Sequence, residues 1–412
     1  MKILALSHSL WFGGAQISNV EFFNLLRKLT ELKVLVCNNI STESGYITNF
    51  KNIETYRVPC NISMSYPIMD IKKYRKLIEW ADVIWITDTE YRTAPRIREI
   101  RRTPIVAHLH SYVLICPWGG VLYGYTDICV EKCSPWRIIR CKQNINLELA
   151  KIGLLSTARA SIYWLLDFTK GPLEYFKWTR IAHDAIESIN GFVPVSKALW
   201  DIHTSHMPEF KDKPFRVIYN LATEPLKYVK PIPNEPYENY ILYASGPSPS
   251  KGSYILLKAW SKVSKEFKEL KLYMVRCKDS WLEEKARKMN LRNIVFMEKL
   301  PPNIYYYLMY KAKAVIMPSI WPEPFGRIPV EANRLGVPAV VTNRGALPEI
   351  IENGVTGVVS EAEDNSLAEA IATVVSRDWD RGKIIKSTSR RLNPRDIVLR
   401  LLKFFERVSS MI

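Results

Sequence analysis

The chain has 412 residues, of which 47% are hydrophobic and 24% are charged, and its formal net charge is +17. A chain of this length is too long for one ordinary hydrophobic core, so we expect two domains, and its composition excludes a disordered or fibrous protein. The positive charge predicts an anionic partner, which composition alone does not identify as nucleic acid, membrane or phosphorylated substrate.

The sequence offers no strong targeting or membrane-spanning segment. The apolar run at the N-terminus is too short for the core of a signal peptide, and the best candidate for a membrane span, residues 152–166, is interrupted by Arg159. The seven cysteines are an odd number, which argues against a secreted disulfide framework. We therefore expect a cytoplasmic protein, in solution or peripheral on the cytosolic face of a membrane.

Short apolar runs alternate with helical patterns through the first half of the chain. A helix is expected at Ala15–Leu29, and an aromatic-rich helical insertion is expected at residues 144–183. Because strand and helix otherwise alternate, the pattern predicts an α/β domain with a doubly wound parallel sheet. The strands that it predicts are Lys2–Ser7, Lys33–Cys37, Val83–Thr87, Ile105–His108, Gly191–Val195 and Arg216–Tyr219.

A proline-rich passage, residues 222–239, predicts the linker between two domains, because its four prolines oppose regular structure. A second alternating series follows, so the sequence predicts two Rossmann-like domains, at residues 1–225 and 226–393. The strands expected in this series are Tyr240–Ser245, Leu270–Val275, Asn293–Met297, Ala314–Pro318 and Pro338–Thr342. The expected helices are Tyr254–Glu266, Trp281–Met289, Ile304–Lys311, Pro329–Leu335, Ser366–Val375 and, at the end of the chain, Pro394–Val408.

Two glutamates of the second domain, Glu323 and Glu331, are separated by seven residues. The first is expected in a loop at the carboxyl end of a strand and the second in the following helix, which is where open α/β sheets bind ligands. Gly326 lets the backbone N–H groups approach a ligand closely, and a helical glutamate can accept two hydrogen bonds from a ribose diol. A pair of solvated surface glutamates is the alternative interpretation.

The segments that follow, Gly336–Gly345, Leu347–Ile351 and Asn353–Gly357, complete a passage that resembles the GT4 family of retaining glycosyltransferases. Weaker matches extend the resemblance to Lys251-Gly252, Val195-Ser196 and Gly13-Gly14-Ala15. The resemblance implies the GT-B fold, in which two Rossmann-like domains face each other across a cleft. It also implies transfer of a hexose-type sugar from a nucleotide-diphosphate sugar, and catalysis that requires no metal cofactor.

The resemblance assigns a role to each matching residue. Glu331 would bind the donor ribose, and Glu323 would contact the transferred sugar together with the backbone amides of Pro324, Phe325 and Gly326. Lys251 would neutralise the diphosphate, and Gly14 would leave space for the phosphates. His110 would be the first-domain histidine near the transferred sugar, with His108 as the competing choice. The C-terminal helix, residues 394–412, would cross back to the first domain.

The sequence departs from the family pattern at several positions. Gly246 stands where the family has an arginine that meets the diphosphate, and Arg344 or Arg327 could substitute for it. Other residues, near Arg276-Cys277 and at Glu298, replace glycines of the expected base pocket, so the nucleotide base stays open.

The resemblance implies front-face transfer, and no first-domain carboxylate stands out as the nucleophile that a double displacement would need. In front-face transfer the departing diphosphate accepts the proton of the acceptor hydroxyl. Asp378-Trp379-Asp380 carries the letters of a metal-binding D-x-D loop, but it lies between late helices and is interpreted as a solvated turn.

Four cysteines, Cys116, Cys129, Cys133 and Cys141, fall within one short stretch of the first domain. Four thiolates can hold a structural zinc ion tetrahedrally, although a C-x3-C spacing is less common than C-x2-C. Disulfides and free buried thiols are the alternatives. A subgroup of the GT4 family carries a similar segment, which implies a structural loop near the acceptor site.

An arginine-rich stretch, residues 92–102, and the aromatic insertion together predict docking on an anionic membrane surface. The expected acceptor is therefore a glycan, in particular a lipid-linked glycan or a glycolipid. A nucleotide-sugar 2-epimerase is the enzymatic alternative. A basic nucleic-acid-binding protein is the other alternative, but no RNA or DNA motif is present, so we expect no nucleic-acid partner.

Overall fold

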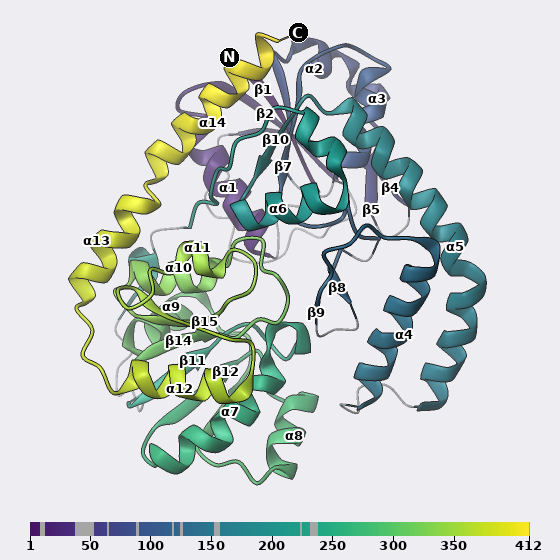
Figure 1. Cartoon of the computed structure of the whole chain (residues 1–412). Helices are drawn as coiled ribbons and strands as arrows, with labels where there is room; N and C mark the ends of the chain where they lie inside the picture. The colour runs from purple at the N-terminus through teal and green to yellow at the C-terminus, as the bar shows by residue number, and fades with distance from the viewer. Residues whose placement is uncertain are drawn as a thin grey trace. The chain divides into compact units, whose positions relative to one another are not determined.

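A computed structural model of the chain (Figure 1) describes residues 1–8, 13–37, 53–63, 66–87, 90–117, 119–123, 127–151, 157–222, 225–230 and 238–411. It divides into two compact units. Unit 1 contains residues 1–221 and 394–412, and unit 2 contains residues 222–393.

Unit 1 is built on a six-stranded sheet in which every neighbouring pair of strands is parallel. The strand order is β10-β7-β6-β1-β2-β3. Its central strands are apolar and almost entirely buried, because helices cover both faces of such a sheet. The strands are β1 (Lys2–Ser7), β2 (Glu31–Cys37), β3 (Glu54–Val58), β6 (Val83–Ile86), β7 (Ile105–Leu109) and β10 (Gly191–Pro194).

The remaining elements of unit 1 include a pair of packed helices, α4 and α5, where the helical insertion was expected (Figure 1). The helices are α1 (Gly14–Leu26), α2 (Arg75–Trp80), α3 (Ala94–Arg98), α4 (Pro135–Lys151), α5 (Thr157–Ser188), α6 (Lys197–His206) and α14 (Pro394–Ser409). The 3-10 helices are η1 (Lys72–Tyr74), η2 (Glu90–Thr93) and η3 (Pro208–Asp212). Two short hairpins pair β4 (Cys60–Ser63) with β5 (Tyr66–Met69) and β8 (Leu122–Tyr123) with β9 (Asp127–Ile128).

The C-terminal helix α14 packs within unit 1. The ring of Phe405 meets the ring of Trp85 edge-on, with 5.6 Å between centroids. Gly191 at the start of β10 lies so close to α14 that an added Cβ would be 2.9 Å from a methyl group of Val408. The apolar face of the amphipathic helix α14 is therefore buried against the sheet of unit 1.

Unit 2 repeats the architecture with a second all-parallel six-stranded sheet, in the order β13-β12-β11-β14-β15-β16. Its strands are β11 (Tyr240–Tyr243), β12 (Lys271–Val275), β13 (Ile294–Met297), β14 (Ala314–Met317), β15 (Ala339–Thr342) and β16 (Gly357–Ser360). Its helices are η4 (Pro225–Tyr228), η5 (Pro249–Lys251), α7 (Ser253–Glu266), α8 (Trp281–Lys288), α9 (Pro302–Lys311), α10 (Arg327–Arg334), α11 (Leu347–Ile350), α12 (Asp364–Val375) and α13 (Arg381–Arg391).

Both sheets have the same Rossmann-like strand order. The first three strands in the sequence are placed one after another from the middle of the sheet to one edge, and the next three from the middle to the other edge. The order reverses between β1 and β6 in unit 1 and between β11 and β14 in unit 2. Ligands of such sheets bind at the carboxyl ends of the strands, at this point of reversal. The loops after these four strands are therefore where a site is expected.

The expected strand at Arg216–Tyr219 is wrong as a regular strand. Arg216 and Ile218 donate backbone hydrogen bonds to β10, but the only bridge assigned there joins Phe215 to Phe192. This stretch runs along the sheet edge without completing a ladder. The structure also adds strands that the pattern missed, β3 and β16, which are short edge strands with little apolar signal. Among the described helices, none is both long enough and apolar enough to cross a bilayer.

Candidate functional site

The loop after β14, residues 318–326, carries Glu323 and ends where α10 begins. The apolar strand Ala314–Met317 is fully buried and stops at Pro318. Gly326 then takes a φ of +90°, and a Cβ at that position would lie 2.6 Å from Leu347 Cδ2. A glycine is therefore required to turn the chain into α10 with its first backbone N–H groups free of side-chain caps.

A second glycine, Gly345, fixes the backbone of this loop from the other side. The backbone of Glu323 pairs with Gly345 as an isolated bridge, and the N–H of Ala346 donates to the carbonyl of Glu323 at 2.8 Å. Gly345 has a φ of +59°, and a Cβ there would lie 2.4 Å from Glu323 N. The Asn343–Gly345 turn and the glutamate loop are thus locked together by direct backbone contact.

The carboxylate of Glu323 is buried, with 4% of the residue exposed, and one of its two oxygens accepts two hydrogen bonds. Lys251 Nζ donates to its Oε1 at 2.6 Å, and Ser319 Oγ donates to the same atom at 2.9 Å. The Lys251 ammonium also lies 4.1 Å from the centroid of the Trp321 ring, within range of a cation–π interaction. Since a buried charge is costly unless it is paired, each of the two ions holds the other in place.

Lys251 comes from the loop after β11, on the opposite side of the strand-order reversal from Glu323. Gly252 has a φ of +72°, and a Cβ there would lie only 1.7 Å from the carbonyl oxygen of Pro318. The carbonyl of Ser250 accepts backbone hydrogen bonds from Ile320 and Trp321. The loops after β11 and β14 are therefore docked on each other, which brings Lys251 and Glu323 together where a ligand of this fold binds.

Glu331 lies on α10 and forms a buried ion pair with Arg327, one turn earlier. Arg327 Nη2 and Nε donate to Glu331 Oε1 at 2.9 and 3.2 Å, and both side chains are only 6% exposed. Arg327 is therefore committed to Glu331. Arg344 behaves differently: it is half-buried, and within the described part of the chain its guanidinium makes no hydrogen bond or ion pair. Of the two arginines considered for the charge missing at Gly246, Arg344 is the uncommitted one.

The side chains of Pro324 and Phe325 are buried, Phe325 to 2% exposed, so only their backbone groups can meet a ligand. Gly246 has a φ of +76°, with no atom within 4 Å of an added Cβ. In the expected base region, Arg276 has a φ of +65° and burial raises the pKa of Cys277 to about 12. Glu298 is exposed and pairs with Lys278 at 2.8 Å.

In unit 1, the point of strand-order reversal lies after β1 and β6. His8, directly after β1, pairs through Nδ1 with the buried Glu90 at 3.2 Å. Gly13 has a φ of +131° and precedes α1, whose first residue is Gly14. The left-handed conformation that demands a glycine therefore falls on Gly13, while Gly14, which the resemblance selects for the phosphates, begins the helix.

His110 follows β7 and is 7% exposed. Its burial lowers the pKa of the imidazole to about 3, so the ring is neutral near pH 7. The side-chain N–H of Asn220 lies 3.3 Å from Nδ1, which makes Nδ1 the acceptor and places the ring proton on Nε2. No protein group among the described residues meets Nε2. Neutral His110 therefore carries a buried Nε2–H that has no hydrogen-bond acceptor among the described residues.

His108, the competing choice, belongs to the core. It is fully buried, and its ring stacks on Trp85 with 5.7 Å between centroids. Burial, and to a lesser degree the neighbouring His110, lower the pKa of His108 well below the usual value. Asn220, which orients His110, carries no sequence signal: it is a buried polar residue far along the chain, and the adjacent Leu221 carbonyl accepts from Ser18 of α1.

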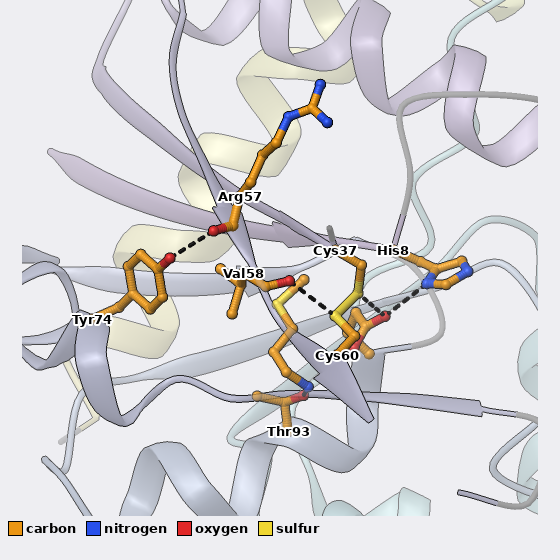
Figure 2. Close-up of a disulfide and its surroundings, with 9 residues drawn as sticks. His8, Cys37, Arg57, Val58, Cys60, Tyr74 and Thr93 are labelled. Atoms are coloured by element: carbon orange, nitrogen blue, oxygen red, sulfur yellow. Dashed lines mark hydrogen bonds and ion pairs between the residues drawn. A yellow bond between two sulfur atoms is a disulfide. The ribbon is translucent and has the colours of Figure 1, made fainter. Parts of the chain in front are cut away.

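The structure contains a disulfide, contrary to what the cysteine count suggests. Cys37 at the end of β2 is bonded to Cys60 in β4, and His8 lies beside them (Figure 2). His8, Cys37 and Glu90 are also the described residues whose potential metal-ligand atoms lie within 4.8 Å of one another. Since the sulfur of Cys37 is in the disulfide, this group lacks a thiolate. The other five cysteines, including the four of the Cys116–Cys141 stretch, are not in disulfides.

Several arginines of the stretch 92–102 are buried or bound to other segments of unit 1. Arg98 donates to the carbonyls of Ser188 and Thr103 at 3.0 and 3.1 Å, and burial lowers its pKa. Arg92 is 6% exposed, and Arg101 bonds to the carbonyl of Glu79. These contacts hold the α3 region to its neighbours, while Arg101 and Arg102 have exposed side chains, and the expected docking on a membrane stays a prediction.

The comparisons with known proteins agree on the class of fold. The structure of Anabaena Alr3699/HepE, solved in complex with UDP and with UDP-glucose, superposes with a TM-score of 0.66 over 99% of this chain and 100% of that chain, at 18% identity. Two parallel Rossmann-like sheets with this likeness define the GT-B fold of glycosyltransferases, and the predicted fold class is confirmed.

The family follows from sequence comparison. Residues 227–391 match the family described as glycosyl transferases group 1. Two relatives are the putative glycosyltransferase YtcC of Bacillus subtilis (26% identity, covering 37% of this chain and 40% of that protein) and the uncharacterized glycosyltransferase MJ1607 of Methanocaldococcus jannaschii (29%, 48% and 54%). The chain thus spans about half of the length of these relatives. The match to the glycosyl transferases group 1 family therefore covers nearly all of unit 2.

Proposed function

We propose that this chain is a retaining glycosyltransferase that moves a hexose-type sugar from a nucleotide-diphosphate sugar to an acceptor hydroxyl. One observation carries the proposal: Lys251 and Glu323 meet at 2.6 Å at the strand-order reversal of a glycosyl transferases group 1 domain. A cation for the diphosphate and a carboxylate for sugar hydroxyls are the two groups that such a donor requires at adjacent positions.

Donor binding in this proposal uses groups that the structure leaves available. Lys251 is 25% exposed, so its ammonium can turn from Glu323 toward a phosphate oxygen while Glu323 accepts from sugar hydroxyls. The backbone N–H groups at the start of α10 favour negative charge. Arg344 supplies the second positive charge that Gly246 lacks, and Glu331, oriented by Arg327, accepts from the donor ribose.

In the transfer step, the bond between the anomeric carbon and the diphosphate oxygen breaks, and the acceptor oxygen bonds to the same carbon on the same face. The acceptor proton passes to the departing diphosphate oxygen, which accounts for the proton and the leaving group. Lys251 and Arg344 stabilise the charge that develops on the diphosphate. Neutral His110 donates from Nε2 to the transferred sugar, because its low pKa keeps it uncharged.

The acceptor that we propose is a lipid-linked glycan or glycolipid, bound by a protein peripheral to an anionic membrane. The support now comes from α4 and α5, where Trp136, Leu147, Leu173 and Phe176 are 56–74% exposed. Trp136 and Leu147 are eleven residues apart and so share a face of α4. Exposed large apolar side chains beside basic residues on helices are typical of interfacial membrane binding.

The rival on the same fold is a nucleotide-sugar 2-epimerase, and the decisive experiment separates the two. Purified protein is incubated with UDP-glucose and a panel of other nucleotide sugars, with and without a lipid-linked acceptor, and products are resolved by NMR. The proposal expects free nucleoside diphosphate and a linkage with retained anomeric configuration. An intact nucleotide sugar with inverted C2 would establish the epimerase, and an inverted linkage would overturn the proposed mechanism.

A further inference from the structure

The four cysteines Cys116, Cys129, Cys133 and Cys141 surround one small cavity in unit 1, and His206 lines the same cavity. The residues come from separate elements: the loop after β7, the end of β9, the approach to α4, α4 itself and the last residue of α6. The cavity volume is about 20 Å³. This space accommodates one water molecule or one ion.

The thiols of this cluster are reduced. No bond joins them, since the disulfide of the described chain is elsewhere. Cys141 Sγ lies 3.4 Å from the Leu122 carbonyl, and Cys129 Sγ lies 3.7 Å from the Glu131 carbonyl. Thiols are weak donors, so these contacts cost little to replace. Each of the four is half-buried, which leaves them reachable by an ion.

His206 supplies an independent indication. The residue is 2% exposed, and its Nδ1 lies 2.9 Å from the carbonyl oxygen of Ile202. A carbonyl only accepts, so Nδ1 carries the proton and Nε2 carries a lone pair. Nε2 is buried and has no partner among the described residues. A histidine whose Nδ1–H bonds a backbone carbonyl while Nε2 is free has the arrangement of a metal ligand with its supporting shell.

The charge around the cavity also favours bound thiolates. Arg137, on α4, lines the cavity, and its Nη2 donates to Cys129 Sγ at 3.8 Å. The positive charge of Arg137 would offset part of the net negative charge that three or four thiolates leave after they bind a divalent cation.

We propose that this cluster binds one zinc ion, with His206 Nε2 as the nitrogen ligand and thiolates of the four cysteines as the sulfur ligands. Within the described residues, no three ligand atoms of the cluster yet lie within 4.8 Å of one another. Binding must therefore rotate the thiols inward about their single side-chain torsion. The ion would tie the β8–β9 hairpin and α4 to α6, and so fix the base of the α4–α5 pair.

The test uses the full chain, purified under reducing conditions without added chelator. We expect about one zinc ion per chain by elemental analysis, and Co²⁺ added after zinc removal should give tetrahedral thiolate–cobalt absorption bands. Cys133→Ser should reduce zinc content at least several-fold, while Cys277→Ser, which removes a buried cysteine of unit 2, should not change it.

His206→Gln should shift the cobalt bands, because it removes the nitrogen ligand. Unchanged bands in His206→Gln would remove that residue from the site. Wild-type protein without zinc and without cobalt bands would overturn the proposal, independently of whether any variant folds. Disulfides within the cluster, detected by mass spectrometry of the unreduced protein, would also overturn it. None of these results depends on glycosyl transfer.

Discussion

The two units share a strand order but not a way of building the site. In unit 2, the groups proposed to bind the donor are close in sequence: Glu323, Gly326 and Glu331 lie within one loop and helix, and Gly252 and Gly345 pack against that loop. In unit 1, the corresponding groups are scattered, because His110 depends on Asn220 and the helices α4 and α5 are inserted between strands. Recognition of one invariant ligand type favours a contiguous motif, whereas the remainder of a fold can vary with its partner.

The largest expected effect concerns the pair that defines unit 2. Glu323→Gln should lower kcat/KM for the donor by about 100- to 1,000-fold, since it removes a charge placed at the reacting centre. Glu284→Gln, which changes an exposed glutamate on α8 of the same unit, is the matched control and should be near wild type. Steady-state kinetics with the identified donor checks both. Equal activities in the two variants would mean that unit 2 holds its ligand elsewhere.

The next effect tests the unit 1 side. His110→Ala should lower turnover by about 10- to 100-fold with little change in fold, because it removes one neutral donor to the bound sugar. His183→Ala alters a half-exposed histidine of α5 and serves as control. Turnover is measured with saturating donor, and circular dichroism reports the fold. Near-normal turnover of the His110 variant would leave unit 1 without a direct part in the chemistry.

The two arginines near the donor groups should separate into different roles. Arg344→Ala should raise the KM for the donor by about 10-fold, because it removes one contact between a positive charge and a phosphate. Gly246→Arg in that background should restore part of the affinity, because no atom lies within 4 Å of an added Cβ; the φ of +76° strains the backbone of any residue other than glycine there, so the restored affinity stays below that of the wild type. Arg327→Ala should instead lower the free energy of unfolding by about 3 kcal/mol, because it leaves Glu331 buried and unpaired. If Arg344→Ala leaves the KM unchanged, a residue other than Arg344 supplies the positive charge that is missing at Gly246.

A smaller effect follows from the buried imidazole of His110. Its folded pKa of about 3 lies below the usual 6.5, so the unfolded chain binds a proton that the folded chain does not. The stabilisation is complete above pH 6.5 and is lost as pH falls from 6.5 toward 3, by up to about 1.4 kcal/mol per pH unit. Urea unfolding of wild type and His110→Gln at pH 7, 6 and 5 measures it. The same pH dependence in both proteins would contradict this assignment.

The smallest effect concerns the exposed apolar residues of α4 and α5. Trp136→Ala with Phe176→Ala should weaken binding to anionic vesicles several-fold at low salt, while donor hydrolysis in solution stays unchanged. Co-sedimentation with vesicles containing phosphatidylserine measures the binding. Leu226→Ala, which removes an exposed apolar side chain of unit 2, is the control. If the double variant binds as wild type does, the helices have another purpose.

The sequence by itself determined the features whose signal lies within a few neighbouring residues. Short apolar runs predicted most strands of both sheets, and a contiguous motif predicted the Glu323–Gly326 loop. Edge strands such as β3 escaped because partial exposure removes the apolar pattern.

Only the tertiary structure decided which distant side chains meet. It joined Cys37 to Cys60, set Asn220 beside His110, and gathered His206 with four cysteines. It also pairs Arg327 with Glu331, while the guanidinium of Arg344 has no partner among the described residues, a difference that two identical residue types do not reveal in the sequence. These contacts depend on how sheets and helices pack. Packing brings together residues that are far apart in the sequence, and no local pattern predicts which of them meet.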